Sequence, residues 1–193
     1  MDILKEIAED LKSKRIKTKI IKNENGEYIE TELYHGSRQT KEKINSFDDN
    51  MSRDNAVSVW FTPDKEYASE YGTVHKYKVE IRNPLDLREE TTPDIEFGQK
   101  DMTVQEWVDL FNSKGVSVDI KDDEWVDVYV KLWDLLYGYD IDATKATNIN
   151  QSLMNSNYDF IIHKEVGSYK NIVDAFGKIK KSFRLEGSSP SGN

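Results

Sequence analysis

The sequence has no cysteine, only four prolines and no long apolar run. Without cysteine the chain can form no disulfide and offers no thiolate to a metal ion. No apolar stretch approaches the roughly 20 residues that a membrane-spanning helix needs. The first residues also lack the basic and then apolar layout of a secretory signal peptide. We therefore expect a protein of the bacterial or host cytosol that has no membrane partner.

Positive charge is scarce as well, since 27 Lys and Arg stand against 36 Asp and Glu, for a net charge of -9. An acidic surface repels phosphate backbones, which argues against broad, non-specific binding of nucleic acid. A small basic cluster near the C-terminus consists of Lys178, Lys180, Lys181 and Arg184. We interpret this cluster as a solvated face.

The length of 193 residues, with 37% hydrophobic and 33% charged residues, fits one globular domain. We place that domain at residues 1–186 and predict that it carries a helical insertion at about 102–156. Residues 187–193 are rich in Gly, Ser and Pro, so we predict a disordered tail there.

The first informative stretch is a hairpin that leads into a polar triplet. Asn25-Gly26 separates two alternating segments within residues 17–33, which is the strongest short signal for a β-hairpin. The second strand continues into His35, Gly36 and Ser37. The glycine lets the backbone come close to whatever its two polar neighbours touch.

The second stretch, residues 57–72, predicts a strand followed by a helix. Val57, Val59 and Phe61 alternate as in a strand. The segment Thr62-Pro63-Asp64 then indicates a capped helix start with proline in the first turn. Ala68 and Tyr71, three residues apart, are predicted to share one face of that helix.

These two stretches together resemble the ADP-ribosyltransferases of the diphtheria-toxin and poly(ADP-ribose) polymerase type. That family has a strand that ends in His-Gly-Ser/Thr, then a strand with an aromatic residue, then a helix with a Tyr. Here the two aromatic positions fall on Trp60 and Tyr71, whose separation of eleven residues is the family's spacing. The resemblance covers roughly residues 30–87 and 158–183.

The resemblance implies NAD as co-substrate, with a set of contacting residues: His35, Gly36, Ser37, Trp60, Phe61 and Tyr71. Two aromatic faces, from Trp60 and Tyr71, can stack on the flat, positively charged nicotinamide ring. Backbone amides beside a glycine can hold its carboxamide, and a histidine can hydrogen-bond a ribose hydroxyl. The alternative is that the aromatic residues belong to the core and that His35 is a satisfied strand-end residue.

The family's third element is an acid on a late strand that stabilises the charge developing as nicotinamide leaves. Alignment of the closing strand puts Lys170 at that position, and lysine cannot do this work. Nearby candidates are Glu165, Asn171 and Asp174. We favour Glu165, just past a strand at 160–163, because the resemblance extends to small phage-encoded members that keep their acid at this earlier point. The catalytic set is then Glu165, His35 and Tyr71.

The rest of the chain predicts elements that surround this site: a helix at 2–14, a strand at 73–81, a loop at 88–101, helices at 104–111, 122–137 and 143–155, and strands at 160–163 and 171–176. We expect His75 to be a surface residue of its strand. Asp140 and Asp142 are interpreted as solvated turn residues, so no metal is expected. The fold class is α+β, with a split two-sheet β-core of the ADP-ribosyltransferase type and flanking helices.

The insertion carries three of the four tryptophans, Trp107, Trp125 and Trp133. We expect part of this aromatic surface to contact a target or an inhibitor chain. Simple core packing is the competing explanation.

The function predicted is transfer of one ADP-ribose unit from NAD to a macromolecular acceptor, with release of nicotinamide. A protein acceptor is favoured over nucleic acid, although RNA is retained if the basic cluster lines the acceptor groove. The resemblance implies a toxin or phage effector, with an inhibitor or antitoxin as a further partner. The alternative is a catalytically inactive module that binds a partner through its aromatic insertion.

Overall fold

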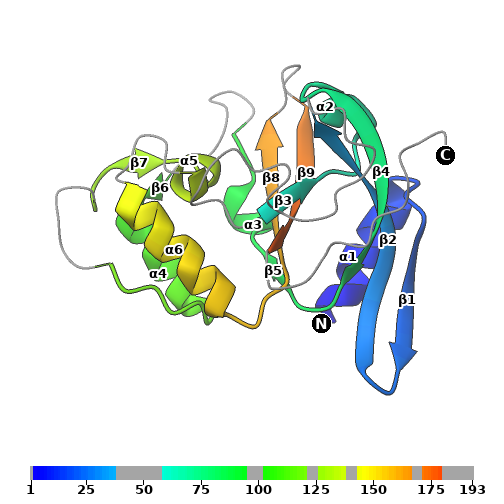
Figure 1. The fold of residues 1–193 in the computed structure, drawn as a ribbon, viewed down its shortest axis with the longest axis horizontal. Coiled ribbons are helices and arrows are strands. Elements are labelled where there is room, and N and C mark those ends of the chain that lie inside the picture. Colours follow the sequence, from blue (N-terminus) through cyan, green and yellow to red (C-terminus); the bar gives the residue numbers. More distant parts are fainter. Residues whose placement is uncertain are drawn as a thin grey trace.

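Two β-sheets form the centre of the molecule (Figure 1). The first has three strands in the order β1-β2-β4, and the second has four in the order β3-β9-β8-β5. The structure, a computed structural model, describes residues 2–37, 58–94, 102–120, 126–137, 143–166 and 171–179. The predicted α+β fold with a split two-sheet core is confirmed.

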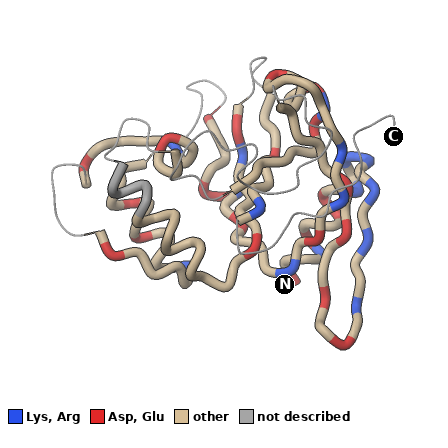
Figure 2. The backbone as a smooth tube through the Cα atoms, viewed as in Figure 1, with Lys and Arg blue, Asp and Glu red and all other residues tan. Residues whose placement is uncertain are grey.

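The first sheet is built around the predicted hairpin. Its strands are β1 (Thr18–Asn23), β2 (Gly26–Ser37) and β4 (Thr73–Ile81), and all neighbours are antiparallel. The turn consists of Glu24 and Asn25, after which Gly26 adopts a φ of 111° that favours glycine. Lysines and glutamates pair across β1 and β2, and Figure 2 shows the two charge types along this hairpin.

The second sheet contains β3 (Ser58–Phe61), β5 (Pro84–Asp86), β8 (Phe160–Val166) and β9 (Ile172–Ile179). The strand β5 is parallel to β8, whereas the β3–β9 and β8–β9 pairs are antiparallel. Both late strands extend further than predicted. As a result Glu165 lies within β8 and pairs with Val173, and the prediction that it follows the strand is wrong.

A backbone bridge ties the two sheets together, and three helices begin close to them. An isolated bridge between Tyr34 and Thr62 joins β2 to the end of β3, with both backbone hydrogen bonds at 2.9 Å. The helix α1 (Ile3–Ser13) begins after Asp2, whose carboxylate accepts from the Leu4 amide. The helices α2 (Lys65–Ser69) and α3 (Arg88–Thr91) are short, and α3 lies where the sequence predicted only a loop.

The insertion forms a separate layer beside the second sheet, where α4 and α6 lie next to each other in Figure 1. Thr103 and Glu106 make the predicted capping box at the start of α4. The predicted helix at 143–155 is also present. The elements of this layer are β6 (Met102–Thr103), α4 (Val104–Ser113), β7 (Tyr129–Val130), α5 (Leu132–Tyr137) and α6 (Ala143–Asn155).

The single helix predicted at 122–137 is wrong over its described part, residues 126–137. Only α5 is helical there, and the preceding residues are a turn and the short strand β7. The reason is that their carbonyls serve α4: Val126 and Val128 accept from the first amides of that helix. The Val130 carbonyl accepts from the Trp107 indole at 2.9 Å. Backbone carbonyls used in this way are not free for helical hydrogen bonds.

The second sheet separates two apolar clusters. On one face Phe160, Ile162 and Phe176 pack with α1 and the first sheet. On the other face Ile161 and Ile179 pack with the insertion. This division follows from the alternation of side chains along a strand. None of the described helices is long and apolar enough to cross a membrane.

The basic cluster near the C-terminus is only partly described. Lys178 is buried, and its ammonium lies 5.0 Å from the centre of the Phe160 ring. The interpretation of Lys178 as part of a solvated face is therefore wrong. Lys180, Lys181 and Arg184 lie outside the described residues, as do Asp140, Asp142, Lys170 and the predicted tail.

Candidate active site

His35 sits near the end of β2 and is tied to the second sheet. Its Nδ1 donates to the Trp60 carbonyl at 2.6 Å, so the neutral ring keeps its lone pair on Nε2. That Nε2 atom is buried and has no hydrogen-bond partner among the described residues. Burial lowers the pKa of His35, and the neighbouring His75 adds to this effect. The histidine is thus a neutral hydrogen-bond acceptor.

Gly36 is the contact point between β2 and α2. A Cβ built on it would lie 1.8 Å from the Ala68 carbonyl oxygen and 3.2 Å from the Tyr71 Cβ. Only glycine fits so close to another backbone. Gly36 thus allows the close approach of α2, which places Tyr71 beside the polar triplet, and the approach to a ligand stays a prediction. Ser37 is half-buried and pairs with Thr73 on β4.

The helix α2 is shorter than expected. Asp64 is its cap and accepts from the Tyr67 amide at 3.1 Å, so Pro63 precedes the cap and is not in the first turn. The helix ends at Ser69. Tyr71 therefore follows the helix and is 47% exposed, whereas Ala68 is buried. The prediction that these two residues share a helical face is wrong.

Glu165 is buried in β8 and reaches α2. The Tyr67 hydroxyl donates to its Oε2, and the Tyr71 hydroxyl lies 2.9 Å from that of Tyr67. The other carboxylate oxygen, Oε1, stands 3.8 Å from Nε2 of His163, which is beyond hydrogen-bond length. Burial lowers the pKa of His163, so this neighbour is uncharged near neutral pH.

The two alternatives to Glu165 are placed differently. Asp174 lies on the opposite face of the second sheet, where it is paired with Lys14 of α1. Its carboxylate is almost fully buried there, and burial raises its pKa. Asn171 is exposed and precedes β9. Of the three candidates, Glu165 is the one that the structure joins to Tyr67 of α2 and, through Tyr67, to Tyr71.

Trp60 and Phe61 point to opposite sides of β3. The Phe61 ring belongs to the cluster between the sheets, 5.7 Å from the His35 ring. The Trp60 indole lies over Gly177, where a Cβ would come within 2.8 Å of the ring. It also contacts Trp133 of α5, with centroids 5.5 Å apart, and meets His163 edge-on at 4.9 Å.

Trp60 and Tyr71, the predicted clamp, are thus connected only through other residues. Trp60 contacts His163, which lies near Glu165, and Tyr67 links Glu165 to Tyr71. Whether the two rings hold one ligand between them stays a prediction.

Four elements therefore close a ring of contacts. His35 joins β2 to β3, and Trp60 joins β3 to β8. Glu165 joins β8 to α2, and Gly36 brings α2 back to β2. This ring gathers a neutral acceptor, a carboxylate, phenols and an indole from segments about 100 residues apart in the chain.

The sequence did not single out two residues of this region, Tyr67 and His163, and it misplaced a third, His75. Tyr67 precedes Tyr71 by four residues, a spacing that brings side chains together on helices. His163 precedes Glu165 by two, so both lie on one face of a strand. His75 was expected at the surface, but it is buried opposite His35, and both its ring nitrogens lack partners among the described residues.

The comparison with known families agrees with this geometry. The profile of a family described as ADP-ribosyltransferase in polyvalent proteins matches residues 23–182. The chain belongs to the ADP-ribosyltransferases. No curated protein and no solved structure gives a significant match to it.

For an ADP-ribosyltransferase the residues present suit NAD. Within the described residues the buried Nε2 of His35 has no partner, so it needs a donor such as a hydroxyl group. The buried indole nitrogen of Trp60 is also unpartnered within the described residues. In the described part of the chain, no group of three or more His, Asp or Glu is placed to hold a metal.

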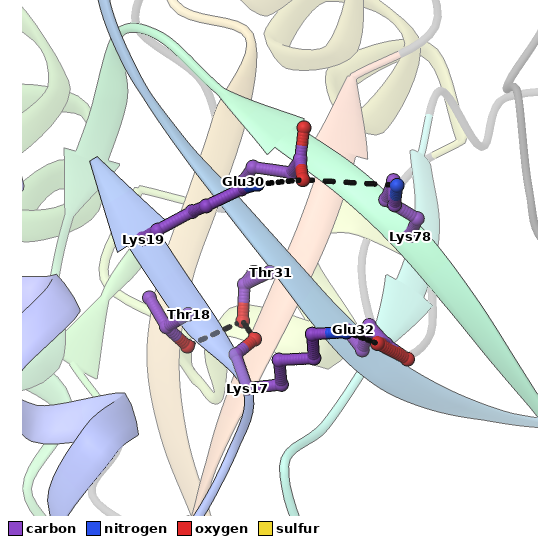
Figure 3. Close-up of a pocket in the computed structure, with 7 residues that line it drawn as sticks. All are labelled: Lys17, Thr18, Lys19, Glu30, Thr31, Glu32 and Lys78. Carbon is purple, nitrogen blue, oxygen red and sulfur yellow. Dashed lines mark hydrogen bonds and ion pairs between the residues drawn. The ribbon is translucent and has the colours of Figure 1, made fainter. Parts of the chain in front are cut away.

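A hollow of about 270 Å³ lies on the first sheet of the transferase, away from these residues (Figure 3). Its charged side chains pair with one another: Lys19 and Lys78 with Glu30, and Lys17 with Glu32. Its threonines, Thr18 and Thr31, share a hydrogen bond of 2.7 Å. Its polar groups are thus occupied within the chain.

Proposed function

We propose that the protein transfers a single ADP-ribose unit from NAD to a macromolecular acceptor and releases nicotinamide. The observation that carries this proposal is the position of Glu165, a buried carboxylate that accepts from the Tyr67 hydroxyl and is linked through it to Tyr71. In the reaction the bond from nicotinamide to the ribose C1′ breaks and a bond from C1′ to the acceptor forms. The nicotinamide leaves neutral, and the acceptor loses a proton.

Each residue has one task in this scheme. The Nε2 of neutral His35 accepts a hydrogen bond from a ribose hydroxyl, while Gly36 and Ser37 hold the ligand through their backbone. Trp60 and Tyr71 offer aromatic faces to the nicotinamide, with Phe61 behind the histidine. Glu165 stabilises the positive charge that develops on the ribose as nicotinamide departs.

A protein acceptor fits the net charge of -9 better than nucleic acid does. The resemblance supports a toxin or phage effector that works in the cytosol and has a cognate inhibitor. The competing function is a binding module that acts through the insertion, but the insertion exposes less aromatic surface than this function requires. Trp107 is fully buried in its own chain, and Trp133 packs on Trp60; Trp125 lies outside the described residues.

The test is incubation of the purified protein with labelled NAD and a cell lysate, with and without nuclease. Label on protein that survives nuclease supports the proposal. Glu165→Gln should lower turnover by roughly 100-fold while NAD binding persists. Glu9→Gln, on the exposed side of α1, is the matched control. If no acceptor is labelled and no nicotinamide is released, the binding module is the better description.

A further inference from the structure

Tyr67 occupies the centre of a hydrogen-bonded chain at the site. Its hydroxyl donates to Oε2 of Glu165, and the Tyr71 hydroxyl lies 2.9 Å away. A phenol has one proton to donate. Since Tyr67 gives its proton to the carboxylate, it must accept from Tyr71. The order is therefore Tyr71 to Tyr67 to Glu165.

The backbone around Tyr67 holds it in place. Its amide donates to the cap residue Asp64 at 3.1 Å, and the end of α2 rests against Gly36. Its side chain is half-buried, and its ring meets that of Tyr71 at 77° with centroids 5.5 Å apart. Burial first, and then the charge of Glu165, raise the pKa of Tyr67. The hydroxyl thus stays a donor.

The two oxygens of Glu165 are not equivalent. Oε2 is held by Tyr67. Oε1 makes no hydrogen bond with any described residue and lies 3.8 Å from the ring of His163. One oxygen is therefore anchored, and the other has no hydrogen-bond partner within the described residues.

We propose that Tyr67 is the positioning residue of this site, because its hydroxyl fixes Oε2 of Glu165 and so presents Oε1 to the ribose of NAD. This inference rests on the proposed function. It adds a residue that acts on the substrate only through the carboxylate.

The decisive variant is Tyr67→Phe, which removes the hydroxyl and keeps the ring. We expect kcat for nicotinamide release from NAD in water to fall about 10- to 100-fold, the scale of a misplaced catalytic group. The KM for NAD should change less than threefold, since Tyr67 does not touch the ligand. The control is Tyr129→Phe, which removes a hydroxyl from a side chain that is 65% exposed.

A double-mutant cycle separates positioning from mere support of the fold. If Tyr67 acts through Glu165, then Tyr67→Phe combined with Glu165→Gln should be no slower than Glu165→Gln alone. A further measurement needs no NAD: in protein labelled with ¹³C at the tyrosine Cζ, Glu165→Gln should shift the resonances of Tyr67 and Tyr71. The resonance of Tyr129 should stay unchanged.

The outcomes are distinct. If the wild type is active and Tyr67→Phe has the same kcat, the inference is overturned but the proposed function is not. The inference is also overturned if the reductions in kcat of the two single variants multiply in the double variant. It is overturned as well if Glu165→Gln leaves the Tyr67 resonance unchanged. A wild type that releases no nicotinamide overturns both the function and the inference.

Discussion

Replacing Gly36 with Ala is the sharpest test of how the site is assembled. The new Cβ would fall 1.8 Å from the Ala68 carbonyl oxygen, where ordinary contact begins at 3.4 Å. The obstacle is backbone, so no side-chain rotation relieves it. The end of α2 must therefore move away from β2 by on the order of 1 Å.

Such a displacement acts directly on the hydrogen-bonded chain. Hydrogen bonds of this type weaken beyond about 3.2 Å, so Tyr67 should lose its hold on Glu165. For Gly36→Ala we expect a loss of about 1–3 kcal/mol in the free energy of unfolding, as for other overpacked sites. Nicotinamide release should fall by roughly 100-fold. Urea denaturation and an NAD turnover assay measure the two effects.

The control is Gly115→Ala, which changes stability without touching the site. Gly115 ends α4 at a φ of 87°, and a Cβ there meets nothing within 4 Å. An alanine in that conformation costs about 1–2 kcal/mol. If Gly36→Ala were as active as Gly115→Ala and kept the Tyr67–Glu165 hydrogen bond in its structure, the argument for the contact of α2 with β2 would fail.

Three further predictions concern stability. Lys14→Met leaves the buried Asp174 without its nearest ammonium and should lower the free energy of unfolding by about 1–2 kcal/mol. This is less than for a fully buried pair because Lys14 is 38% exposed, and an unchanged midpoint in urea denaturation would contradict it. Burial lowers the pKa of His35 and His163, so the folded state binds these protons more weakly than the unfolded chain does. Stability should be complete above pH 6.5 and fall at lower pH by up to about 1.4 kcal/mol per unit for each histidine, and equal stability at pH 7.5 and 5.5 would refute the assignment. Trp133→Ala removes the ring that packs on the indole of β3 and should cost about 1–3 kcal/mol, whereas an unchanged melting temperature would show that the contact contributes nothing.

Local signals predicted the parts of the fold that local physics decides. The hairpin at Gly26 and the capping box of Thr103 and Glu106 are complete within a few residues, so they appear where the sequence indicated them. The helix predicted across residues 126–131 failed for the opposite reason. Its carbonyls are taken by α4 and by Trp107, which are partners that no window around Val128 contains.

The candidate site shows the same division. The spacing of Trp60 and Tyr71 indicated the segments that form the candidate site, but spacing alone could not show which residues each ring contacts. Trp60 is covered by Trp133, from a segment outside the resemblance. The sequence favoured Glu165 over Asp174 only through the resemblance; the extension of β8 to Val166 adds that the two carboxylates lie on opposite faces of the sheet.

That separation of faces gives the N-terminal helix a part in the site. A slip of one residue in the pairing of β8 would exchange Glu165 for Lys164, because neighbouring side chains on a strand point to opposite faces. The ion pair of Lys14 with Asp174 lies on the face of β9 that meets α1 and adds to the apolar packing there. Since Glu165 pairs with Val173, next to Asp174, the same contact favours the register in which β8 carries the carboxylate toward Tyr67. Lys14 lies before the segment that matches the family, residues 23–182. A helix outside the family match thus helps to hold the orientation on which the proposed chemistry depends.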